Sequence, residues 1–556
     1  MQIAEHMKLV IVGGVAGGAS AAARARRVAE QAEIVVLERG AHISFANCGL
    51  PYHIGGVIAA RNDLLVQTPQ ALLRRYNIDA RVRSEVTRIN REHKTVSVRD
   101  QGANREYDEP YDALILSTGA EPVRPALPGV NSPLVRTLRS LADMDAIEQI
   151  VAAAACTRAL IVGGGYIGLE MAEALRRREW EVTLVELTQQ VMGPADPEMA
   201  APLQRELARH GVALRLGVSA SAFHDRDGAV DVTLSTGETV ACGLVVLAIG
   251  VTPDVGLARA AGLALGERGG IVVDEHLRTT DPCIFAVGDA VEVMDTVAGV
   301  KTLIPLAGPA NRQGRIAADN ALGRDTVYRS TQGTAICQVF GLAIAMTGLS
   351  EKAARRLGIP HEKIHVHPFD HAGYFPGAAQ MALKLLFDPR NGRILGAQAV
   401  GAAGIDKRID VLAVAIRAGL TVYDLEEMEL CYAPPFGSAK DAVNYAGFVG
   451  ANVLRGDVGL CHAADAAQAR PDQAILDVRS ATEFNAGAIP GALNIPVDAL
   501  RARLAEVPRD KELLVYCQVG LRGYLACRIL TQHGFACRNL SGGYKTFCDT
   551  PRTPPA

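Results

Sequence analysis

Two stretches of the chain, residues 8–40 and 158–187, repeat the same order of apolar strand, glycine-rich turn, helix and second strand. The first reads KLVIV, GGVAGGASAAARARR and EIVVLER, and the second reads RALIV, GGGYIG, LEMAEALRRR and EVTLVEL. Such a turn brings backbone amides and a helix N-terminus to a pyrophosphate, and an acidic residue that ends the second strand can bond a ribose hydroxyl. The sequence therefore predicts two dinucleotide-binding units in one chain of 556 residues.

The two turns differ in their match to the dinucleotide fingerprint. Their predicted binding residues are Gly13, Gly14, Val15, Ala16 and Gly18 in the first unit and Gly163, Gly165, Tyr166, Ile167 and Gly168 in the second. Val15 stands where the fingerprint has its second glycine, so the first match is imperfect, whereas the second is complete. The second strands end at Glu38 and Glu186. Since a carboxylate repels a 2′-phosphate, Glu186 favours NADH over NADPH.

Three further segments, 113–122, 244–254 and 283–293, read as strands that end in small-residue turns. The turns contain Thr118 with Gly119, Gly250, and Gly288 with Asp289. Together with the glycine units, these segments make residues 8–448 resemble the FAD-dependent pyridine nucleotide-disulfide oxidoreductases. The resemblance implies a bound FAD whose ribityl hydroxyls Asp289 would hold, an inserted NAD(P)H domain, and a C-terminal interface domain that completes a homodimer.

The stretch SFANCGLP carries a single cysteine, Cys48, and neither a CxxxxC pair nor a C-terminal His-Glu pair is recognisable. It resembles the single-cysteine branch of the family, the coenzyme A-disulfide reductases and their persulfide-reducing relatives. The neighbouring peroxidases and oxidases carry a histidine in the first glycine turn, where this chain has Val15 and Ala16. A turn that opens a helix lowers a thiol pKa, so Cys48 is predicted to be the nucleophile; the alternative is an inert buried cysteine.

The resemblance also implies binding residues outside the glycine turns. For the cofactors these are Arg39, Ser44, Asn47, Pro305, Ala307, Ala433 and Pro434. For coenzyme A they are Ser20, Arg24, Arg27, Ser44, Asn47, Arg75, Asn311 and, from the partner subunit, Tyr374, Tyr432 and Lys440. The two tyrosines are also predicted to approach the active cysteine. The chain departs from its relatives at Tyr76, which replaces a basic residue, and at Phe375, which replaces a second tyrosine.

Residues of about 470–550 resemble a rhodanese domain, on the segments LDVR, IPGALNIP and CQVGLR. The loop from Cys517 to Arg522 lies between an apolar strand and a helix, so its amides can form a nest for a thiolate or persulfide. Arg522 adds positive charge. Relatives usually have histidine where Ala488 stands, and the alternative is a rhodanese module without activity. Cys527 and Cys537 are interpreted as structural.

The predicted fold class is α/β, with two Rossmann-like dinucleotide-binding domains, an α+β dimerisation domain and a C-terminal α/β rhodanese domain. The predicted boundaries are 1–120 and 271–330 for the two parts of the FAD domain, 121–270 for the NADH domain, 331–450 for the dimerisation domain, 451–468 for a linker and 469–556 for the rhodanese domain.

Composition excludes some classes of function. A net charge of -3 gives no basis for binding nucleic acid or an anionic membrane, and the apolar runs are too short to span a bilayer. The 11 cysteines form no CxxC, which argues against a zinc site or disulfide scaffold and fits a reducing cytoplasm. The start shows no basic region or cleavage site, so no signal peptide is expected.

The leading functional prediction is an NADH-dependent, FAD-containing reductase of coenzyme A persulfide, other small persulfides or polysulfide, which releases sulfide. Cys48 would attack the substrate, which brings the second sulfur itself, and the rhodanese loop suggests traffic in sulfane sulfur. One alternative is a coenzyme A-disulfide reductase. Another is a sulfurtransferase or sulfur-delivery protein, in which flavin only resets the thiol; a redox sensor has no supporting feature.

Overall fold

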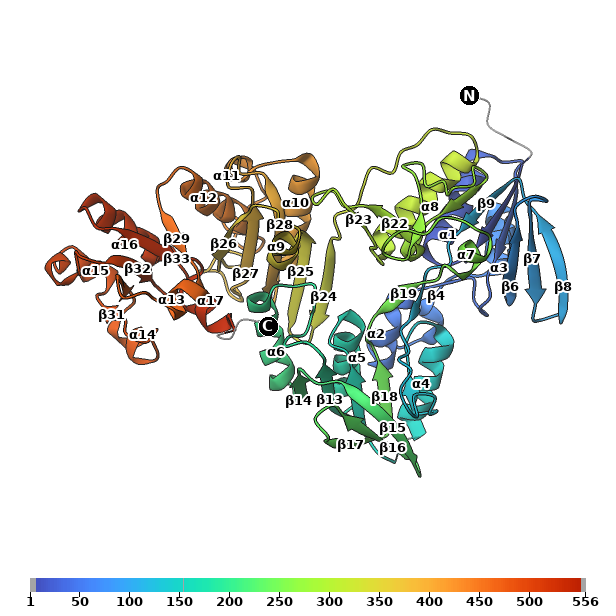
Figure 1. Cartoon of the computed structure of the whole chain (residues 1–556), viewed down its shortest axis with the longest axis horizontal. Coiled ribbons are helices and arrows are strands. Elements are labelled where there is room, and N and C mark those ends of the chain that lie inside the picture. The colour runs from blue at the N-terminus through green and yellow to red at the C-terminus, as the bar shows by residue number, and fades with distance from the viewer. Residues whose placement is uncertain (1–6, 154, 552–556) are drawn as a thin grey trace. The chain divides into compact units, whose positions relative to one another are not determined.

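The computed structural model describes residues 7–153 and 155–551. It contains two compact units: unit 1 comprises Met1–Leu187 with Val218–Gly333, and unit 2 comprises Thr188–Gly217 with Thr334–Ala556. The fold class is the predicted one, with Rossmann-like sheets in unit 1, and an antiparallel sheet and a rhodanese sheet in unit 2 (Figure 1). The predicted domain boundaries stay predictions, and the outer ends of the first and last domains lie outside the described residues.

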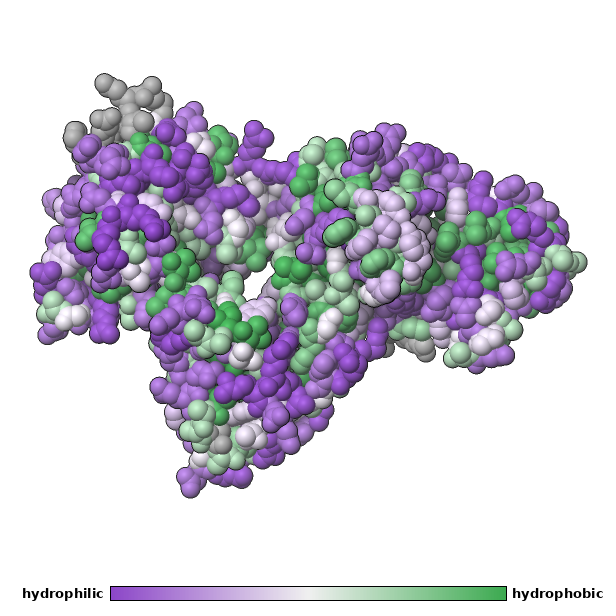
Figure 2. Space-filling model, turned by 180° about the vertical axis from the view of Figure 1, so that it is seen from behind, coloured by the Kyte–Doolittle hydropathy of each residue, from purple (hydrophilic) through white to green (hydrophobic). Residues whose placement is uncertain are grey.

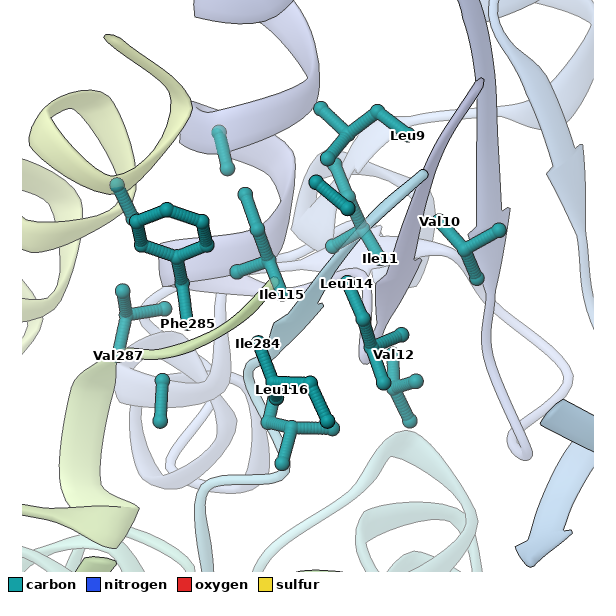
Figure 3. Close-up of a cluster of buried hydrophobic side chains, with 14 of the residues drawn as sticks. Leu9, Val10, Ile11, Val12, Leu114, Ile115, Leu116, Ile284, Phe285 and Val287 are labelled. Carbon is teal, nitrogen blue, oxygen red and sulfur yellow. The ribbon is translucent and has the colours of Figure 1, made fainter. Parts of the chain in front are cut away.

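A parallel sheet of order β21-β9-β1-β2-β5 forms the first half of unit 1. Its strands are β1 (Lys8–Val12), β2 (Glu33–Leu37), β5 (Asp79–Arg81), β9 (Ala113–Leu116) and β21 (Ile284–Ala286). Apart from Lys8, the β1 and β9 side chains are apolar and almost fully buried, as expected for parallel strands covered on both faces. Figure 3 shows side chains of β1, β9 and β21 meeting in this core. The helices α1 (Ala16–Val28) and α8 (Ala307–Ala321) pack closely together.

The second glycine-rich segment, residues 158–187, belongs to a separate parallel sheet in unit 1. The order runs through β11 (Val135–Arg136), β18 (Leu244–Leu247), β12 (Arg158–Val162) and β13 (Glu181–Glu186). The helix α5 (Tyr166–Arg177) follows β12. The predicted strand-turn-helix-strand order is therefore confirmed in both glycine-rich segments, residues 8–40 and 158–187. Both glycine turns therefore lie at the carboxyl ends of parallel strands, where α/β sheets bind ligands.

Shorter elements complete unit 1. Its small sheets are β6-β7-β8, β15-β16-β17, β20-β22-β23 and the two-stranded β3-β4 and β10-β19. The strands are β3 (Ser44–Phe45), β4 (Leu65–Gln67), β6 (Ser84–Asn90), β7 (Thr95–Asp100), β8 (Arg105–Pro110), β10 (Ala120–Pro122), β15 (Ala220–Arg226), β16 (Ala229–Leu234), β17 (Thr239–Cys242), β19 (Val251–Pro253), β20 (Ile271–Val272), β22 (Val291–Met294) and β23 (Lys301–Thr302). The helices are α2 (Leu50–Ile54), α3 (Pro69–Tyr76), α4 (Leu141–Ala153) and α7 (Gly256–Ala260), with 3-10 turns η1 (Asn47–Gly49), η2 (Arg61–Leu64) and η3 (Gly288–Ala290).

Unit 2 begins with an antiparallel sheet of order β24-β25-β28-β27-β26. Its strands are β24 (Ala335–Val339), β25 (Leu342–Gly348), β26 (Glu362–Val366), β27 (Ala382–Phe387) and β28 (Ile394–Gly401). The same unit contains β14 (Val212–Leu216) and the helices α6 (Pro197–Arg209), α9 (Glu351–Arg356), α10 (Ile405–Ala418), α11 (Val422–Glu427) and α12 (Ala442–Leu454). All eight residues of β28 are buried, which makes it the centre of this sheet.

The rhodanese part of unit 2, orange to red in Figure 1, is a parallel sheet of order β29-β33-β32-β30-β31. Its strands are β29 (Gly459–Cys461), β30 (Gln473–Asp477), β31 (Leu493–Asn494), β32 (Glu512–Tyr516) and β33 (Cys537–Leu540). Its helices are α13 (Ala463–Ala467), α14 (Ala481–Asn485), α15 (Val497–Leu500), α16 (Leu521–Gln532) and α17 (Gly543–Asp549), with a 3-10 turn η4 (Leu504–Glu506).

The stretch 451–468, predicted as a linker, contains regular structure instead. The helix α12 continues through its first residues, β29 pairs in parallel with β33, and α13 follows. The rhodanese part is also bonded to the antiparallel sheet, because His365 contacts the Ser541 hydroxyl and His367 contacts the Thr546 hydroxyl, the latter at 2.8 Å. The Ala- and Asp-rich composition suits a short helix as well as a loop, so composition alone did not distinguish them.

Within the described residues, no helix combines the length and apolar character needed to cross a membrane. Figure 2 shows hydrophilic residues over much of the visible face, with hydrophobic residues in smaller groups among them.

Candidate active site

Cys48 lies in η1, directly before α2, as the Gly- and Pro-bounded stretch predicts. Cys48 is exposed. Its backbone amide donates a hydrogen bond to the side-chain oxygen of Asn47 at 3.1 Å. The Cys48 thiol donates to the same oxygen at 3.8 Å. The thiol is therefore accessible and held in one orientation, as a nucleophile requires.

The sequence predicts a lowered pKa for Cys48, but the protein groups around the thiol raise that pKa. Neighbouring protein atoms remove part of the water around the thiol, and this desolvation, with the carboxyl groups of Glu170 and Asp289, raises the pKa of Cys48. The helix that follows has only five residues, so its partial positive charge is small. Two carboxylates near a thiol oppose formation of a second negative charge.

Glu170 and Tyr52 are a pair near Cys48 that sequence reasoning did not identify. The Tyr52 hydroxyl donates to the Glu170 carboxyl at 3.3 Å. Burial raises the pKa of Glu170 to about 7, against the opposing effect of the Tyr52 hydrogen bond. The signal was present in GGGYIGLE, where Glu170 follows the second glycine turn, but its approach to Cys48 depends on the packing of α2 against α5. This pair can hold or release a proton near neutral pH.

Glu170→Gln is expected to lower the pKa of Cys48. Glu170 becomes ionised as the pH rises through about 7, and its charge then holds the neighbouring thiol protonated. In the variant that charge is absent, so Cys48 should react with iodoacetamide at lower pH than in the wild type. The measurement is the pH profile of alkylation of the Cys48 peptide by mass spectrometry, using the holoenzyme.

The matched control is Glu173→Gln, which removes an acid on the same helix that is paired with Arg177 at 2.8 Å. The charge of Glu173 is the smallest of the effects on the Glu170 pKa, so this alkylation profile should shift far less than that of Glu170→Gln. An unchanged Cys48 profile in Glu170→Gln would show that Glu170 does not act on the thiol.

The two glycine turns have the same geometry in unit 1. Gly13 and Gly163 have φ of 93° and 109°, which favours glycine. A Cβ on Gly18 would lie 1.8 Å from the Gly13 oxygen, and one on Gly168 would lie 2.0 Å from the Gly163 oxygen. Both positions therefore require glycine for close packing of turn against helix.

The acidic residues that end the second strand of each glycine-rich segment make the same contact. Glu38 accepts the Gly14 amide at 3.0 Å, and Glu186 accepts the Gly164 amide at 2.8 Å. A Cβ on Gly165 would meet no atom within 4 Å, so the space beside the second turn is open to a ligand. Val15, the departure from the fingerprint, stands as the N-cap of α1. Both turns thus fit a dinucleotide, with a carboxylate beside each.

Asp289 fits the predicted flavin site by its chemistry. It is half-buried in η3, and burial raises the pKa of its carboxyl, opposed by the charge of Arg139. A desolvated carboxyl of this kind is suited to accept hydroxyl donors of a ligand. The neighbouring Gly288 amide donates to Gln313 at 2.7 Å, which fixes the turn.

The other predicted cofactor residues of unit 1 are placed as follows. Thr118 donates to the Asp254 carbonyl at 2.6 Å, and Gly119 and Gly250 both have positive φ. Arg39 is paired with Glu121 and, at 3.3 Å, with Asp254. Ser44 is buried, whereas Asn47, Pro305 and Ala307 are exposed. Ala433 and Pro434 are half-buried in unit 2.

The predicted coenzyme A residues of unit 1 include some that bond other side chains of the protein and others that are exposed. Ser20 on α1 donates to Asn311 on α8, so these two are neighbours. Arg24 is held by Asp319, with hydrogen bonds of 2.8 and 3.1 Å, and any phosphate must compete with that carboxylate. Arg27 and Arg75 are exposed, and Tyr76 packs against the apolar core. The exposed arginines are therefore better placed for a phosphate than Arg24.

Tyr374 and Tyr432 come together in unit 2. Their hydroxyls are 2.9 Å apart, and the residues are 75% and 49% exposed. Large exposed aromatic side chains are typical of an interface or a ligand site. Lys440 is exposed as well. Phe375, which replaces the second tyrosine, lies edge-on to His371.

The rhodanese loop places Cys517 at the end of β32 and Arg522 in the first turn of α16. Cys517 is buried, and its sulfur accepts the Gly520 amide at 3.1 Å, as the predicted nest requires. Gly520 has a φ of 106°, which turns that amide toward the sulfur. This loop is built to stabilise negative charge on Cys517.

Two partners of the rhodanese loop were not predicted. Glu483 on α14 binds Arg522 through two bonds of 2.8 and 2.6 Å, so most of the positive charge expected of Arg522 is neutralised. Arg522 still interacts with the Cys517 sulfur. Tyr445 on α12 lies near the same thiol; burial, with Cys517, raises the pKa of Tyr445. The helix α12 is far from the Cys517 loop in the sequence, so this neighbour could not be read from the loop itself.

Family models match three parts of the chain. Residues 7–314 match the pyridine nucleotide-disulphide oxidoreductase model, residues 334–443 match the dimerisation domain of the same family, and residues 462–550 match the rhodanese-like domain. The three matches follow the order predicted from the sequence.

Known proteins resemble the chain over most of its length. A coenzyme A disulfide reductase of Staphylococcus aureus is 34% identical over 442 residues, which cover 79% of this chain and 99% of that protein. The structure of reduced CoADR-RHD from Bacillus anthracis is 47% identical, with a TM-score of 0.96 and 99% of both chains covered. A NAD-dependent persulfide reductase from A. fulgidus is 36% identical, with a TM-score of 0.91, covering 97% of this chain and 100% of that one.

Proposed function

Because the chain belongs to the pyridine nucleotide-disulphide oxidoreductase family, we propose that it is an NADH-dependent flavoprotein reductase of small persulfides or polysulfide that releases sulfide. Coenzyme A persulfide is the leading substrate. The family implies FAD and NAD(P)H as cofactors, and the chain carries both the family's dimerisation domain and a rhodanese-like domain.

The observation that carries the proposal is the occurrence of two different sulfur sites in one chain. Cys48 is an accessible thiol beside the nucleotide units, and Cys517 is a buried thiol in an amide nest. A reductase of simple disulfides needs no sulfane-sulfur carrier, whereas a second thiol in an amide nest can carry sulfane sulfur in persulfide metabolism. The persulfide reductase from A. fulgidus, which aligns over 97% of this chain, supports the same reading.

Cys48 performs the exchange step. Its thiolate attacks a substrate R–S–SH and forms either Cys48–S–SH with release of RS⁻, or Cys48–S–S–R with release of HS⁻. FAD, when bound, supplies the two electrons that NADH provides to this sulfur centre. Glu170, whose pKa burial raises to about 7, and Tyr52 hold a proton near the reacting thiol.

The finer assignments follow from single residues. Glu186, whose carboxyl accepts the Gly164 amide, supports NADH over NADPH. Ser20 with Asn311, and exposed Arg27 and Arg75, support coenzyme A as a ligand of unit 1. The paired Tyr374 and Tyr432 support a homodimer in which these tyrosines reach the Cys48 site of the partner subunit. Eleven cysteines without a CxxC motif support a cytoplasmic location.

Coenzyme A-disulfide reduction is the second candidate, favoured by the 34% identity to the coenzyme A disulfide reductase of Staphylococcus aureus. The relative kcat/KM for coenzyme A persulfide and coenzyme A disulfide, measured by NADH oxidation with sulfide detection, distinguishes the two. We expect the higher kcat/KM for the persulfide, because hydrosulfide is a better leaving group than the coenzyme A thiolate. A higher kcat/KM for the disulfide, without sulfide release, would instead assign the second candidate.

A further inference from the structure

Two cysteines of the rhodanese part, which were interpreted as structural, lie on the packed elements α16 and β33. Cys527 lies in α16 and Cys537 begins β33. Each of the two thiols shifts the pKa of the other, so the side chains are neighbours. The Cys537 thiol also lies 3.6 Å from the Cys527 carbonyl and 3.4 Å from the Thr531 hydroxyl. Both cysteines are free thiols.

The two thiols have unequal properties. Cys537 is only partly buried, and the hydrogen bond from Cys527, with the Thr531 hydroxyl, lowers the pKa of Cys537 to about 7. Cys527 is buried, and the same hydrogen bond raises its pKa. An accessible thiol of low pKa next to a buried second thiol is the arrangement of an attacking cysteine with a resolving cysteine.

The pair is connected to the Cys517 loop through β33 and α16. Asn539, two residues after Cys537, donates to the Gly520 carbonyl at 3.2 Å. The Gly520 amide is the donor to the Cys517 sulfur. Gly523 approaches Asn539 so closely that a Cβ there would lie 2.3 Å from the Asn539 oxygen. A shift of β33 against α16 therefore reaches the amide that stabilises Cys517.

We propose that Cys527 and Cys537 form a reversible disulfide that acts as a redox switch on the Cys517 loop. The oxidant is a small disulfide or polysulfide, the class of molecule that the proposed function handles, but the switch does not depend on Cys48. A disulfide holds two α-carbons within a narrow range of separations, so its formation fixes the spacing of β33 and α16, which the free thiols leave adjustable.

The exchange balances in two steps. The Cys537 thiolate attacks R–S–S–R′, the S–S bond breaks, and Cys537–S–S–R and R′S⁻ form. The Cys527 thiol then loses its proton and attacks the Cys537 sulfur, which releases RS⁻ and forms the Cys527–Cys537 bond. The two cysteines lose two electrons and two protons, and one small disulfide becomes two thiols. A thiol reductant reverses both steps.

The test uses the full-length holoenzyme without NADH, incubated with bis(2-hydroxyethyl) disulfide. Trypsin then separates the cysteines, because Cys527 and Cys537 fall in the peptides GYLACR and ILTQHGFACR, each with one cysteine. We expect most of these two peptides to be joined by a disulfide. We also expect thiocyanate formation from thiosulfate and cyanide, which Cys517 supports, to fall several-fold and to recover after dithiothreitol and desalting.

Variants separate the switch from direct oxidation of Cys517. Cys527→Ala should trap the 2-mercaptoethanol adduct on Cys537, since the resolving thiol is absent. Cys537→Ser should keep its thiocyanate-forming activity through the same treatment, and Cys548→Ser, at an exposed cysteine of the same domain, should lose activity as the wild type does. Absence of the joined peptides, joined peptides without a change in rate, or equal loss of activity in Cys537→Ser would each overturn the proposal.

Discussion

Cys48→Ser is expected to reduce NADH-dependent persulfide reduction by roughly a thousandfold or more, because a serine hydroxyl cannot replace the attacking thiolate. Cys48 is the accessible thiol of η1, oriented by the Asn47 side chain. The substitution removes one sulfur from an exposed residue, so FAD content and unfolding temperature should stay close to those of the wild type. NADH oxidation and sulfide release are the measurements.

Two further variants identify the source of the activity. Cys548→Ser, at another exposed cysteine, should retain the wild-type rate. Cys517→Ala should lose thiocyanate formation but retain reduction of free coenzyme A persulfide, since that substrate can reach Cys48 without a carrier. If Cys517→Ala abolished the main activity while Cys48→Ser spared it, the chain would be a sulfurtransferase instead.

Lys384→Met is expected to destabilise unit 2 by about 3–5 kcal/mol, because it removes the buried cation that three acidic side chains share. The Lys384 side chain is fully buried, and its ammonium lies 2.9, 2.5 and 2.6 Å from Asp196, Glu198 and Glu351. These three acids lie close enough together to hold a metal ion, but the ammonium already supplies the positive charge. His365 extends the cluster from Glu198 to Ser541 of the rhodanese part.

The effect of Lys384→Met should depend on pH. In the wild type, Lys384 lowers the pKa of Glu351 to about 2, with Lys363, despite the opposing effect of burial. Glu351 therefore contributes stability above its unfolded-state pKa, and that stability is lost only as the pH falls toward about 2. Without Lys384, burial raises the pKa of Glu351 relative to wild type, so the variant takes up protons as the pH falls and its difference from wild type narrows.

Hydrogen exchange of β27 and α9 measures this local stability in the full-length protein. Lys407→Met is the matched control, because its side chain is 35% exposed and lies 4.0 Å from its acidic partner. It should change stability by about 1 kcal/mol at most. Unchanged exchange in Lys384→Met would show that the cluster does not stabilise unit 2.

The features predicted correctly from the sequence are those set by short, contiguous windows. A glycine turn requires particular backbone angles within a few residues, so Gly13, Gly163 and Gly520 are recognisable without any knowledge of packing. The same holds for the strand-turn-helix order of both nucleotide units. Composition did not reveal β29 and α13 within the predicted linker, because an Ala- and Asp-rich stretch suits a short helix as well as a loop.

The sequence by itself therefore determined the fold class, the two nucleotide turns and the two sulfur loops. Tertiary structure decided the electrostatics of those sites. Desolvation of Cys48, with the charge of Glu170, reverses the expected direction of the Cys48 pKa shift, Asp319 binds Arg24, and Glu483 binds Arg522. Each of these pairs joins residues from different elements. Charge acts through space over a few ångströms, whereas a sequence pattern records only neighbours along the chain.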